Sequence, residues 1–382
     1  MRPRTMLPIM TIALLLAACG QARTIELTPA ASQPTTAAQA SLTPSVVFDE
    51  GLVLTDALGR EVQFGHPPER IVVAGRTSQL LLHAAYLFPE ASERIVAMEQ
   101  RIQRDNSMLP LVDPAFERKM QLERDVGAEG IAPARPDVVL LKSYLADEMG
   151  PTLDVLGLTQ VYLDLETPEQ FRRDIRMLGD LFADSARAET VLEFYESRLD
   201  LLAGRLADLA QNDRPDVLLL QYTDRGGEVA FSVPSTEWLQ TEMVRLAGGN
   251  PVWTEAAAGG GWTIVNFEQI AAWNPDMIFV VYYPSDPTLI VETLKADAAW
   301  GALQAVRDEQ IHAFCGDFLS WDQPDTHWIL GLEWLARRMQ PERFADLDLR
   351  AEAEAFYGQL YGVDQATFEM RIAPLLNVEE CR

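Results

Sequence analysis

Short runs of apolar residues alternate with helical periodicity along most of the chain. The runs predict buried strands at residues 71–74, 94–98, 137–141 and 160–163, and again at 216–221, 277–281 and 310–314. Residues 77–87, 146–156 and a segment beginning at Thr167 have the spacing of helices. Continuous apolar strands that alternate with helices are typical of βα units and a mainly parallel sheet. Before them, residues 52–54 and 61–64 flank a Gly-containing turn and predict a hairpin.

The middle of the chain predicts one long helix. Thr167 followed by Pro168 and, three residues on, Gln170 is a good helix start. A second helix is expected over residues 185–210, whose 26 residues would span about 39 Å. Its apolar stripe consists of Val191, Tyr195, Leu199, Leu202, Leu206 and Leu209. Because the αβ pattern restarts afterwards, we expect an α/β fold of two Rossmann-like lobes with mainly parallel sheets. One long inter-lobe helix joins them, and the ligand cleft lies between the lobes.

The N-terminus has the pattern of an export signal. Arg2 and Arg4 precede an apolar stretch over residues 6–18, which is too short to span a bilayer. It ends in a bacterial lipobox pattern with Cys19 as the lipidated residue; the alternative is a plain secretory signal. Residues 20–46 are rich in Ala, Thr, Ser, Gln and Pro and predict a flexible linker. The expected organisation is a signal peptide (1–18), a lipidated linker (19–47), a first lobe (48–183), the long helix (184–211) and a second lobe (212–382).

The charge balance excludes several classes of partner. Asp and Glu number 57 against 31 Lys and Arg, which gives a formal net charge of −26. So acidic a chain is unsuited to nucleic acid and to electrostatic adhesion on anionic lipid. There is no apolar run of 18 residues, so a polytopic membrane protein is excluded.

The remaining cysteines and the histidines point to structural roles. Cys315 and Cys381 would meet an oxidising compartment, where they are expected to form a disulfide. The alternative is a buried Cys315 that packs as a small apolar residue beside an exposed Cys381. The four histidines (His66, His83, His312 and His327) are scattered along the chain, so we expect solvated or core residues and no metal site.

An internal echo supports two related lobes. Arg135-Pro136-Asp137 in the first half is matched by Asn274-Pro275-Asp276 in the second. Pro ends a helix and enters a strand where no N–H donor is needed. A glutamate lies seven residues before the Pro in both halves, Glu129 and Glu268. The alternative is that either Glu is only a favourable charge at a helix N-terminus.

At this point the sequence resembles the class III periplasmic binding proteins of ABC importers, which carry ferric siderophores, haem or vitamin B12. The resemblance covers about residues 50–340 and rests on the order of several phrases: 55–60, 67–73, 246–250 and 300–306. It implies a single helix between the lobes and a docking Glu on each lobe for Arg residues of the permease, here Glu129 and Glu268. It also implies an ABC permease with its ATPase as partners, a small-molecule metal chelate as cargo, no cofactor, no catalysis and a monomer.

Ligand residues are expected on loops that follow the carboxyl ends of strands. Aromatic rings with a few Arg side chains suit a large, flat or chelated anion. Core packing is the alternative for each aromatic residue. The expected set is Arg76, Ser78, Arg101, Tyr144, Tyr222, Arg225, Trp262, Tyr282, Tyr283 and Trp321.

No motif of hydrolases, zinc proteases or nucleotide-binding enzymes occurs. Gly259-Gly260-Gly261 precedes no phosphate-binding turn and is expected to be a loop. The sequence therefore predicts an extracytoplasmic, lipid-anchored receptor on the outer face of the cytoplasmic membrane or in the periplasm. Its expected cargo is a ferric siderophore, haem or a corrinoid. A lipid-anchored hydrolase and a non-transport lipoprotein scaffold remain the alternatives.

Overall fold

The chain divides into two units, Met1–Val47 and Phe48–Arg382, and both lobes belong to the second. The computed structural model describes residues 51–99, 104, 106–257 and 259–376. The expected signal peptide, Cys19 and the linker therefore lie outside the described residues. Within the described residues no helix is long and apolar enough to cross a membrane.

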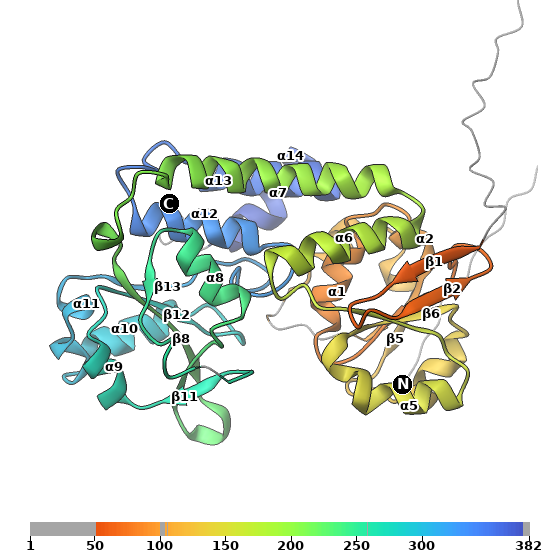
Figure 1. Cartoon of the computed structure of the whole chain (residues 1–382), viewed down its shortest axis with the longest axis horizontal. Coiled ribbons are helices and arrows are strands. Elements are labelled where there is room, and N and C mark those ends of the chain that lie inside the picture. Colours follow the sequence, from red (N-terminus) through yellow and green to blue (C-terminus); the bar gives the residue numbers. More distant parts are fainter. Residues whose placement is uncertain (1–50, 100–103, 105, 258, 377–382) are drawn as a thin grey trace, which may run out of the picture. The chain divides into compact units, whose positions relative to one another are not determined.

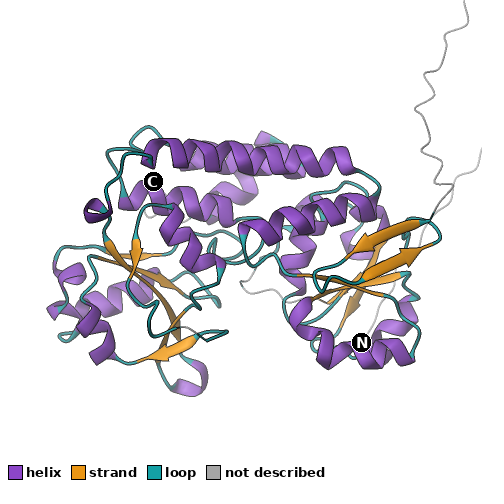
Figure 2. Ribbon diagram, viewed as in Figure 1, coloured by secondary structure: helices purple, strands orange, loops and turns teal. Residues whose placement is uncertain are grey.

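The first lobe is built on a parallel sheet with helices on both faces (Figures 1 and 2). Alternate residues of one strand face different cores: Ile71 and Val73 pack with α1 (Ser78–Ala85), whereas Val72 packs with α4 (Ala128–Ile131) and α5 (Ala146–Val155). Burial on both faces explains why these strands are continuous apolar runs. In sheet order the strands are β5 (Met120–Leu122), β4 (Ile95–Glu99), β3 (Ile71–Val73), β6 (Val138–Lys142) and β7 (Gln160–Leu163). The lobe also contains the predicted hairpin, β1 (Leu52–Thr55) and β2 (Glu61–Phe64), and short helices α2 (Ala91–Arg94) and α3 (Leu109–Val112).

The second lobe has a mixed sheet whose centre is parallel. The predicted strands β8 (Asp216–Thr223), β12 (Met277–Val281) and β13 (Ile311–Ala313) pair in parallel. The sequence did not predict the antiparallel strands β9 (Ala230–Val233) and β11 (Thr263–Val265) or the short β10 (Asn250–Pro251). The helices are α8 (Leu239–Leu246), α9 (Phe267–Trp273), α10 (Thr288–Ala296), α11 (Gln304–Arg307), α12 (Trp328–Met339), α13 (Leu349–Tyr361) and α14 (Gln365–Thr367). The prediction of two α/β lobes with mainly parallel sheets is confirmed.

Two consecutive helices follow the last strand of the first sheet. Thr167 caps α6 (Pro168–Phe182), since its Oγ1 accepts a hydrogen bond from the Gln170 N–H at 3.2 Å. The long helix α7 (Ser185–Leu206) has 22 residues, four fewer than predicted. It ends early because the chain folds back: Leu209 approaches the position that a Cβ on Gly248 would take to within 2.9 Å. Figure 1 shows α7 running along α6, which it contacts closely because Gly179 has no side chain to collide with Ala188.

The repeated Pro-Asp sequence has the same local structure in both lobes. Arg135 and Asn274, the residues before the two prolines, each end a helix with positive φ, 48° and 42°. The Asp137 Oδ2 accepts the Arg70 N–H at 2.9 Å, and the Asp276 Oδ2 accepts the Asp216 N–H at 2.9 Å. In each lobe this aspartate therefore fixes the entry of a neighbouring central strand.

Candidate functional site

One buried carboxylate organises the loops at the carboxyl end of the first sheet. Glu99, at the end of β4, is fully buried. Its Oε2 accepts the Gly75 N–H at 2.7 Å and its Oε1 accepts the Asp125 N–H at 2.9 Å. The loops that follow β3 and β5 are thus tied to β4. Gly75 has φ +92°, and a Cβ there would lie 2.3 Å from the Leu145 Cδ1, so only glycine fits this turn.

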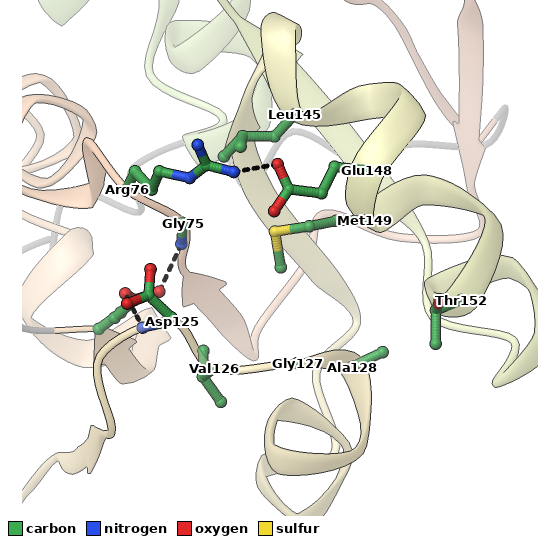
Figure 3. Close-up of a pocket in the computed structure, with 11 residues that line it drawn as sticks. Gly75, Arg76, Asp125, Val126, Gly127, Ala128, Leu145, Glu148, Met149 and Thr152 are labelled. Atoms are coloured by element: carbon green, nitrogen blue, oxygen red, sulfur yellow. Dashed lines mark hydrogen bonds and ion pairs between the residues drawn. The ribbon is translucent and has the colours of Figure 1, made fainter.

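These loops border a small cavity in the first lobe (Figure 3). The Arg76 guanidinium lies at its rim and forms a close ion pair with Glu148, which raises the pKa of Arg76. The cavity holds about 200 Å³, below the usual 300–1,000 Å³ of ligand pockets, so we do not place the cargo in it. It is lined by Gly75, Arg76, Glu99, Asp125, Val126, Gly127, Ala128, Leu145, Glu148, Met149 and Thr152.

Aromatic side chains gather at the carboxyl end of the second sheet. The half-buried rings of Tyr222 and Tyr282 lie edge to face with centroids 5.7 Å apart. The Tyr282 hydroxyl donates to the Asp224 Oδ1 at 3.0 Å, which holds the ring at the end of β12. Four of the predicted residues therefore lie on this one lobe edge, because Trp262 and Tyr283 belong to it as well.

Trp262 and Tyr283 lie at the same edge of the second lobe. We call the four side chains of Tyr222, Tyr282, Trp262 and Tyr283 the aromatic wall. Trp262 lies edge to face with Tyr283, at 6.2 Å between centroids, and with Trp238, at 5.8 Å. The Tyr283 hydroxyl donates to the Asp322 Oδ2 at 2.8 Å. Burial, followed by the charge of Asp322, raises the pKa of Tyr283 well above its usual value, so the phenol stays a donor.

Arg104 connects the first lobe to this region. It follows β4 and donates from Nη1 to the Asp317 carbonyl oxygen of the second lobe at 2.8 Å. A Cβ on Gly316 would lie only 3.0 Å from its guanidinium nitrogens, so the guanidinium packs directly on a glycine. Burial lowers the pKa of Arg104, while the carboxylates of Asp317, Asp286 and Asp322 oppose that shift.

Several buried polar atoms of Arg104 and of the 317–322 segment, whose Asp317 carbonyl it contacts, have no hydrogen-bond partner among the described residues. They are the Arg104 Nε and Nη2, the Asp317 Oδ1, the Trp321 Nε1 and the Asp322 Oδ1. We call these four residues the inter-lobe polar cluster. An unsatisfied buried polar group costs about 1–3 kcal/mol, so such a concentration marks a place where water or a ligand completes the hydrogen bonding. Burial raises the pKa of Asp322 to about 6, against hydrogen bonds from Ser320 and Tyr283.

Not every predicted ligand residue is available to a ligand. Ser78 is fully buried and its hydroxyl donates to the Glu99 carbonyl at 2.6 Å, so it has a structural role. The Trp321 ring is also fully buried and offers only its indole N–H, not a stacking face. Tyr144 is 53% exposed and lies 3.1 Å from the Thr77 hydroxyl, on the first lobe. Arg101 and the side chain of Arg225 lie outside the described residues.

Sequence reasoning missed Arg104 and Asp322. Arg104 comes three positions after the predicted Arg101 in the sequence, so the rule that selected one, a position following a predicted strand, also applied to the other. Asp322 is adjacent to Trp321, but nothing in the sequence distinguishes it from 56 other acidic residues. Its burial is what makes it different.

The two docking candidates occupy equivalent places. Glu129 lies in the first turn of α4 and Glu268 in the first turn of α9, and both are exposed. Their docking role stays a prediction. Cys315 follows β13, is fully buried and is disulfide-bonded. Cys381 lies outside the described residues, so the pairing with Cys315 also stays a prediction.

Two of the histidines that are far apart in the sequence meet in the structure. His83 and His327 are core residues, but their rings lie 5.4 Å apart on either side of Asp325. This is the one group of possible metal-ligating residues that the described part of the chain brings within 4.8 Å. The Nδ1 atoms of both histidines already lie within hydrogen-bond distance of the Asp325 Oδ2, so the group is a hydrogen-bonded network as it stands.

The sequence profile described as periplasmic binding protein matches residues 94–314. A molybdate-binding protein MolA from Haemophilus influenzae is 24% identical over 258 residues, 62% of this chain and 70% of that protein. The solved structure of MolA bound to molybdate superposes with a TM-score of 0.68 at 21% identity, over 81% of this chain and 98% of that chain. The solved structure of a periplasmic solute binding protein from Veillonella parvula superposes with a TM-score of 0.69 at 22% identity, over 87% of this chain and 98% of that chain. The solved structure of the Helicobacter pylori CeuE complex with Ni-His superposes with a TM-score of 0.66 at 17% identity, over 85% of this chain and 99% of that chain.

Proposed function

Because the chain belongs to the periplasmic binding protein family, we propose that it captures an anionic metal chelate between its lobes. It is an extracytoplasmic solute-binding component of an ABC importer and not an enzyme, and its ligand is cargo rather than a cofactor. The chelate class that we propose comprises ferric siderophores, haem and corrinoids.

The inter-lobe polar cluster is the observation that carries this proposal. The Arg104 Nε and Nη2 and the Trp321 Nε1 are buried donors without partners among the described residues. Carboxylate or catecholate oxygens of a chelate would accept hydrogen bonds from them, and a guanidinium suits such planar acceptors. The Tyr283 hydroxyl donates to Asp322 of the cluster and its ring contacts Trp262, so aromatic area for a flat ligand adjoins the cluster. Asp322 opposes an anion only when it is ionised, and its pKa of about 6 lets it be neutralised in mildly acidic medium.

A bare oxyanion is the second candidate cargo. The similarity to a molybdate-binding protein favours it, and so does the small number of free donors. An oxyanion would use Arg104 and Trp321 without needing the aromatic wall. The two candidates therefore differ in which residues they require.

The first test is to identify the cargo and then remove Arg104. Absorbance and elemental analysis of the protein as purified separate the classes, since haem, corrinoids and ferric chelates are coloured and contain iron or cobalt, whereas molybdate is colourless. Affinity is then measured by titration with haemin, cyanocobalamin, a ferric catecholate and molybdate. We expect Arg104→Ala to weaken the probe that binds by about 10- to 150-fold, the range for a lost hydrogen bond to a charged group.

The matched control is Arg307→Ala, because Arg307 is exposed at the end of α11. It should leave affinity unchanged. If Arg104→Ala binds every probe as wild type does, the ligand site lies elsewhere. Loss of binding on Trp262→Ala or Tyr282→Ala favours a flat chelate, and unchanged binding in those variants favours the oxyanion.

We further propose that the mature protein is anchored through lipid on Cys19 and docks through Glu129 and Glu268. The lipobox pattern supports the anchor. The equivalent exposed positions of the two glutamates, each in the first turn of a short helix, support the docking role.

A further inference from the structure

A buried glutamine at the start of α1 has no partner for its amide. Gln79 is the second residue of α1 and is 5% exposed. Neither its Nε2 nor its Oε1 finds a hydrogen-bond partner within residues 51–99, 104, 106–257 and 259–376. An amide offers two donor hydrogens and a strong acceptor, and leaving it unpaired in the interior costs stability. Such a group marks a place where a ligand or water completes the hydrogen bonding.

The position of Gln79 on α1 directs it toward the second lobe at the carboxyl edge of the first sheet. Because α1 follows β3, its first turn lies where the parallel strands end. Gln79 and His83 are four residues apart and share one face of the helix. On that face the His83 Nδ1 lies 2.8 Å from the Asp325 Oδ2, and Asp325 comes shortly after Asp322 of the inter-lobe polar cluster. Gln79 therefore lies one turn from a direct contact between the lobes, on the side of the ligand loops.

The second lobe has an equivalent glutamine. Gln240 is the second residue of α8, which has eight residues as α1 does, and it is 3% exposed. Its helix begins directly after Trp238, whose ring contacts Trp262 of the aromatic wall. Each of these helices is the first α-helix that follows the first strand of its sheet, β3 or β8. The two lobes thus present a buried glutamine from the same place.

The neighbours of Gln240 determine which end of its amide is available. Burial raises the pKa of Tyr283 and that of Asp322, and a hydrogen bond from the Gln240 side chain opposes the shift in both. An ionised carboxylate only accepts, so the Gln240 Nε2 is the donor toward Asp322. The Gln240 Oε1 is left buried, and nothing in the described part of the chain donates to it. It needs an N–H or O–H group from elsewhere.

The buried groups at this place therefore include acceptors as well as donors. The acceptor atoms that lack a partner in the described chain are the Gln79 Oε1, the Gln240 Oε1, the Asp317 Oδ1 and the Asp322 Oδ1. A bare oxyanion or a carboxylate has acceptor oxygens only and would leave them unpaired, at a cost for each. Amide, amine and hydroxyl groups can pair with them.

We propose that Gln79 and Gln240 bind the cargo from the two lobes, and that the cargo is a chelate with N–H or O–H donors beside its acceptor oxygens. This inference rests on the proposed function, because it takes the cargo to lie at the inter-lobe polar cluster. It goes further by naming a ligand residue on a helix of each lobe and by excluding cargo that can only accept hydrogen bonds.

Stability of the cargo-free protein separates a ligand residue from a structural one. Gln79→Met removes the amide and keeps the length of the side chain, so we expect no fall in the unfolding temperature. Gln160→Met is the matched control: Gln160 on β7 is 4% exposed, donates to the Asp154 Oδ1 at 2.7 Å and accepts from the Tyr162 hydroxyl at 2.9 Å. The control should unfold at a lower temperature and bind cargo as wild type does. If Gln79→Met destabilises as much as the control, its amide is satisfied inside the protein and the proposal is wrong.

Titration with four probes tests the cargo class. Cyanocobalamin and the ferric complex of an amide-linked tris-catecholate carry N–H donors, whereas haemin and molybdate present only acceptor oxygens at neutral pH. We expect the wild type to bind one of the first two probes, and a wild type that binds neither overturns the cargo class. For the probe that binds, Gln79→Met and Gln240→Met should each weaken affinity by about 5- to 150-fold.

The Arg104 variant distinguishes failure of this inference from failure of the proposed site. If Arg104→Ala weakens binding and Gln79→Met does not, the cluster holds the cargo and the assignment of Gln79 is wrong. If both variants bind as wild type does, the proposed site itself is wrong. Gln240→Met also removes the donor to Asp322, so Gln79→Met decides the matter if that variant does not fold.

Discussion

Glu333 on α12 is buried with both carboxylate oxygens lacking hydrogen-bond partners among the described residues. Burial, with the nearby charge of Glu352, raises its pKa to about 8, although Arg198 opposes the shift. The Arg198 Nε is 3.8 Å away, and the same guanidinium pairs more closely with Glu352 at 2.7 Å. Glu333 is therefore protonated at neutral pH in the folded protein.

We expect Glu333→Gln to flatten the pH dependence of stability. Because the folded pKa is raised above the unfolded value, the folded state loses stability as pH rises from about 4.5 to about 8. Over that range the loss from this residue is roughly 5 kcal/mol, at 1.36 kcal/mol per pKa unit. Urea denaturation at pH 5 and pH 9 measures it. A wild type and variant that lose equal stability between these two values would contradict the shifted pKa.

At the residue scale the sequence predicted local chemistry better than distant pairing. The Thr167 cap was predicted because its signal lies within four residues. The meeting of His83 with His327 was not, because 244 positions separate them and each alone looks like a core histidine. Arg104 was overlooked for a related reason: its importance comes from the Asp317 carbonyl and Gly316 of the other lobe.

At the scale of elements, α12 packs against the preceding loop in close contact at Gly331. A Cβ on Gly331 would lie 2.4 Å from the Trp321 carbonyl oxygen and 2.9 Å from the Met243 Cε. Gly331→Ala should therefore destabilise the protein by about 1–3 kcal/mol, since a backbone atom cannot yield easily. Gly204→Ala on α7 is the matched control: nothing lies within 4 Å of its Cβ position, and it should stabilise by about 0.5–1 kcal/mol. Thermal unfolding of both variants checks the pair, and a neutral Gly331→Ala would refute the close approach.

In the two central sheets, the strands that stand out most clearly in the sequence are buried on both faces. Strands β3, β6 and β12 are fully buried and stand out as continuous apolar runs. Strands β9 and β11 are only partly buried and lie beside an aromatic wall, so their residues lack a clear pattern. The long helix was predicted too long because Leu209 continues its apolar stripe after the helix has ended.

At the scale of the whole molecule, the repeated Pro-Asp entry gives the two lobes a shared local plan. In each, a short helix ends in a residue with positive φ, and the following Asp anchors a central strand. That plan also fixes where Glu129 and Glu268 lie, seven residues before the prolines and exposed. The sequence could predict this equivalence because the repeat is local. It could not predict the inter-lobe polar cluster, whose members come together only when both lobes are folded.

The docking prediction separates transport from ligand binding. The double variant Glu129→Ala with Glu268→Ala removes one exposed charge from each lobe, and neither residue belongs to the inter-lobe polar cluster or to the aromatic wall. We expect uptake by cells to be abolished while affinity for the identified cargo stays within about threefold, roughly 0.6 kcal/mol. Asp147→Ala with Glu255→Ala is the matched control, because it also removes one exposed carboxylate from each lobe, and it should transport normally. Loss of cargo binding in the first double variant would place these glutamates at the ligand instead. Full uptake would mean that the permease recognises another surface of the protein. Charges at the rim of an interface act on association between the two proteins, so their loss should not change cargo affinity.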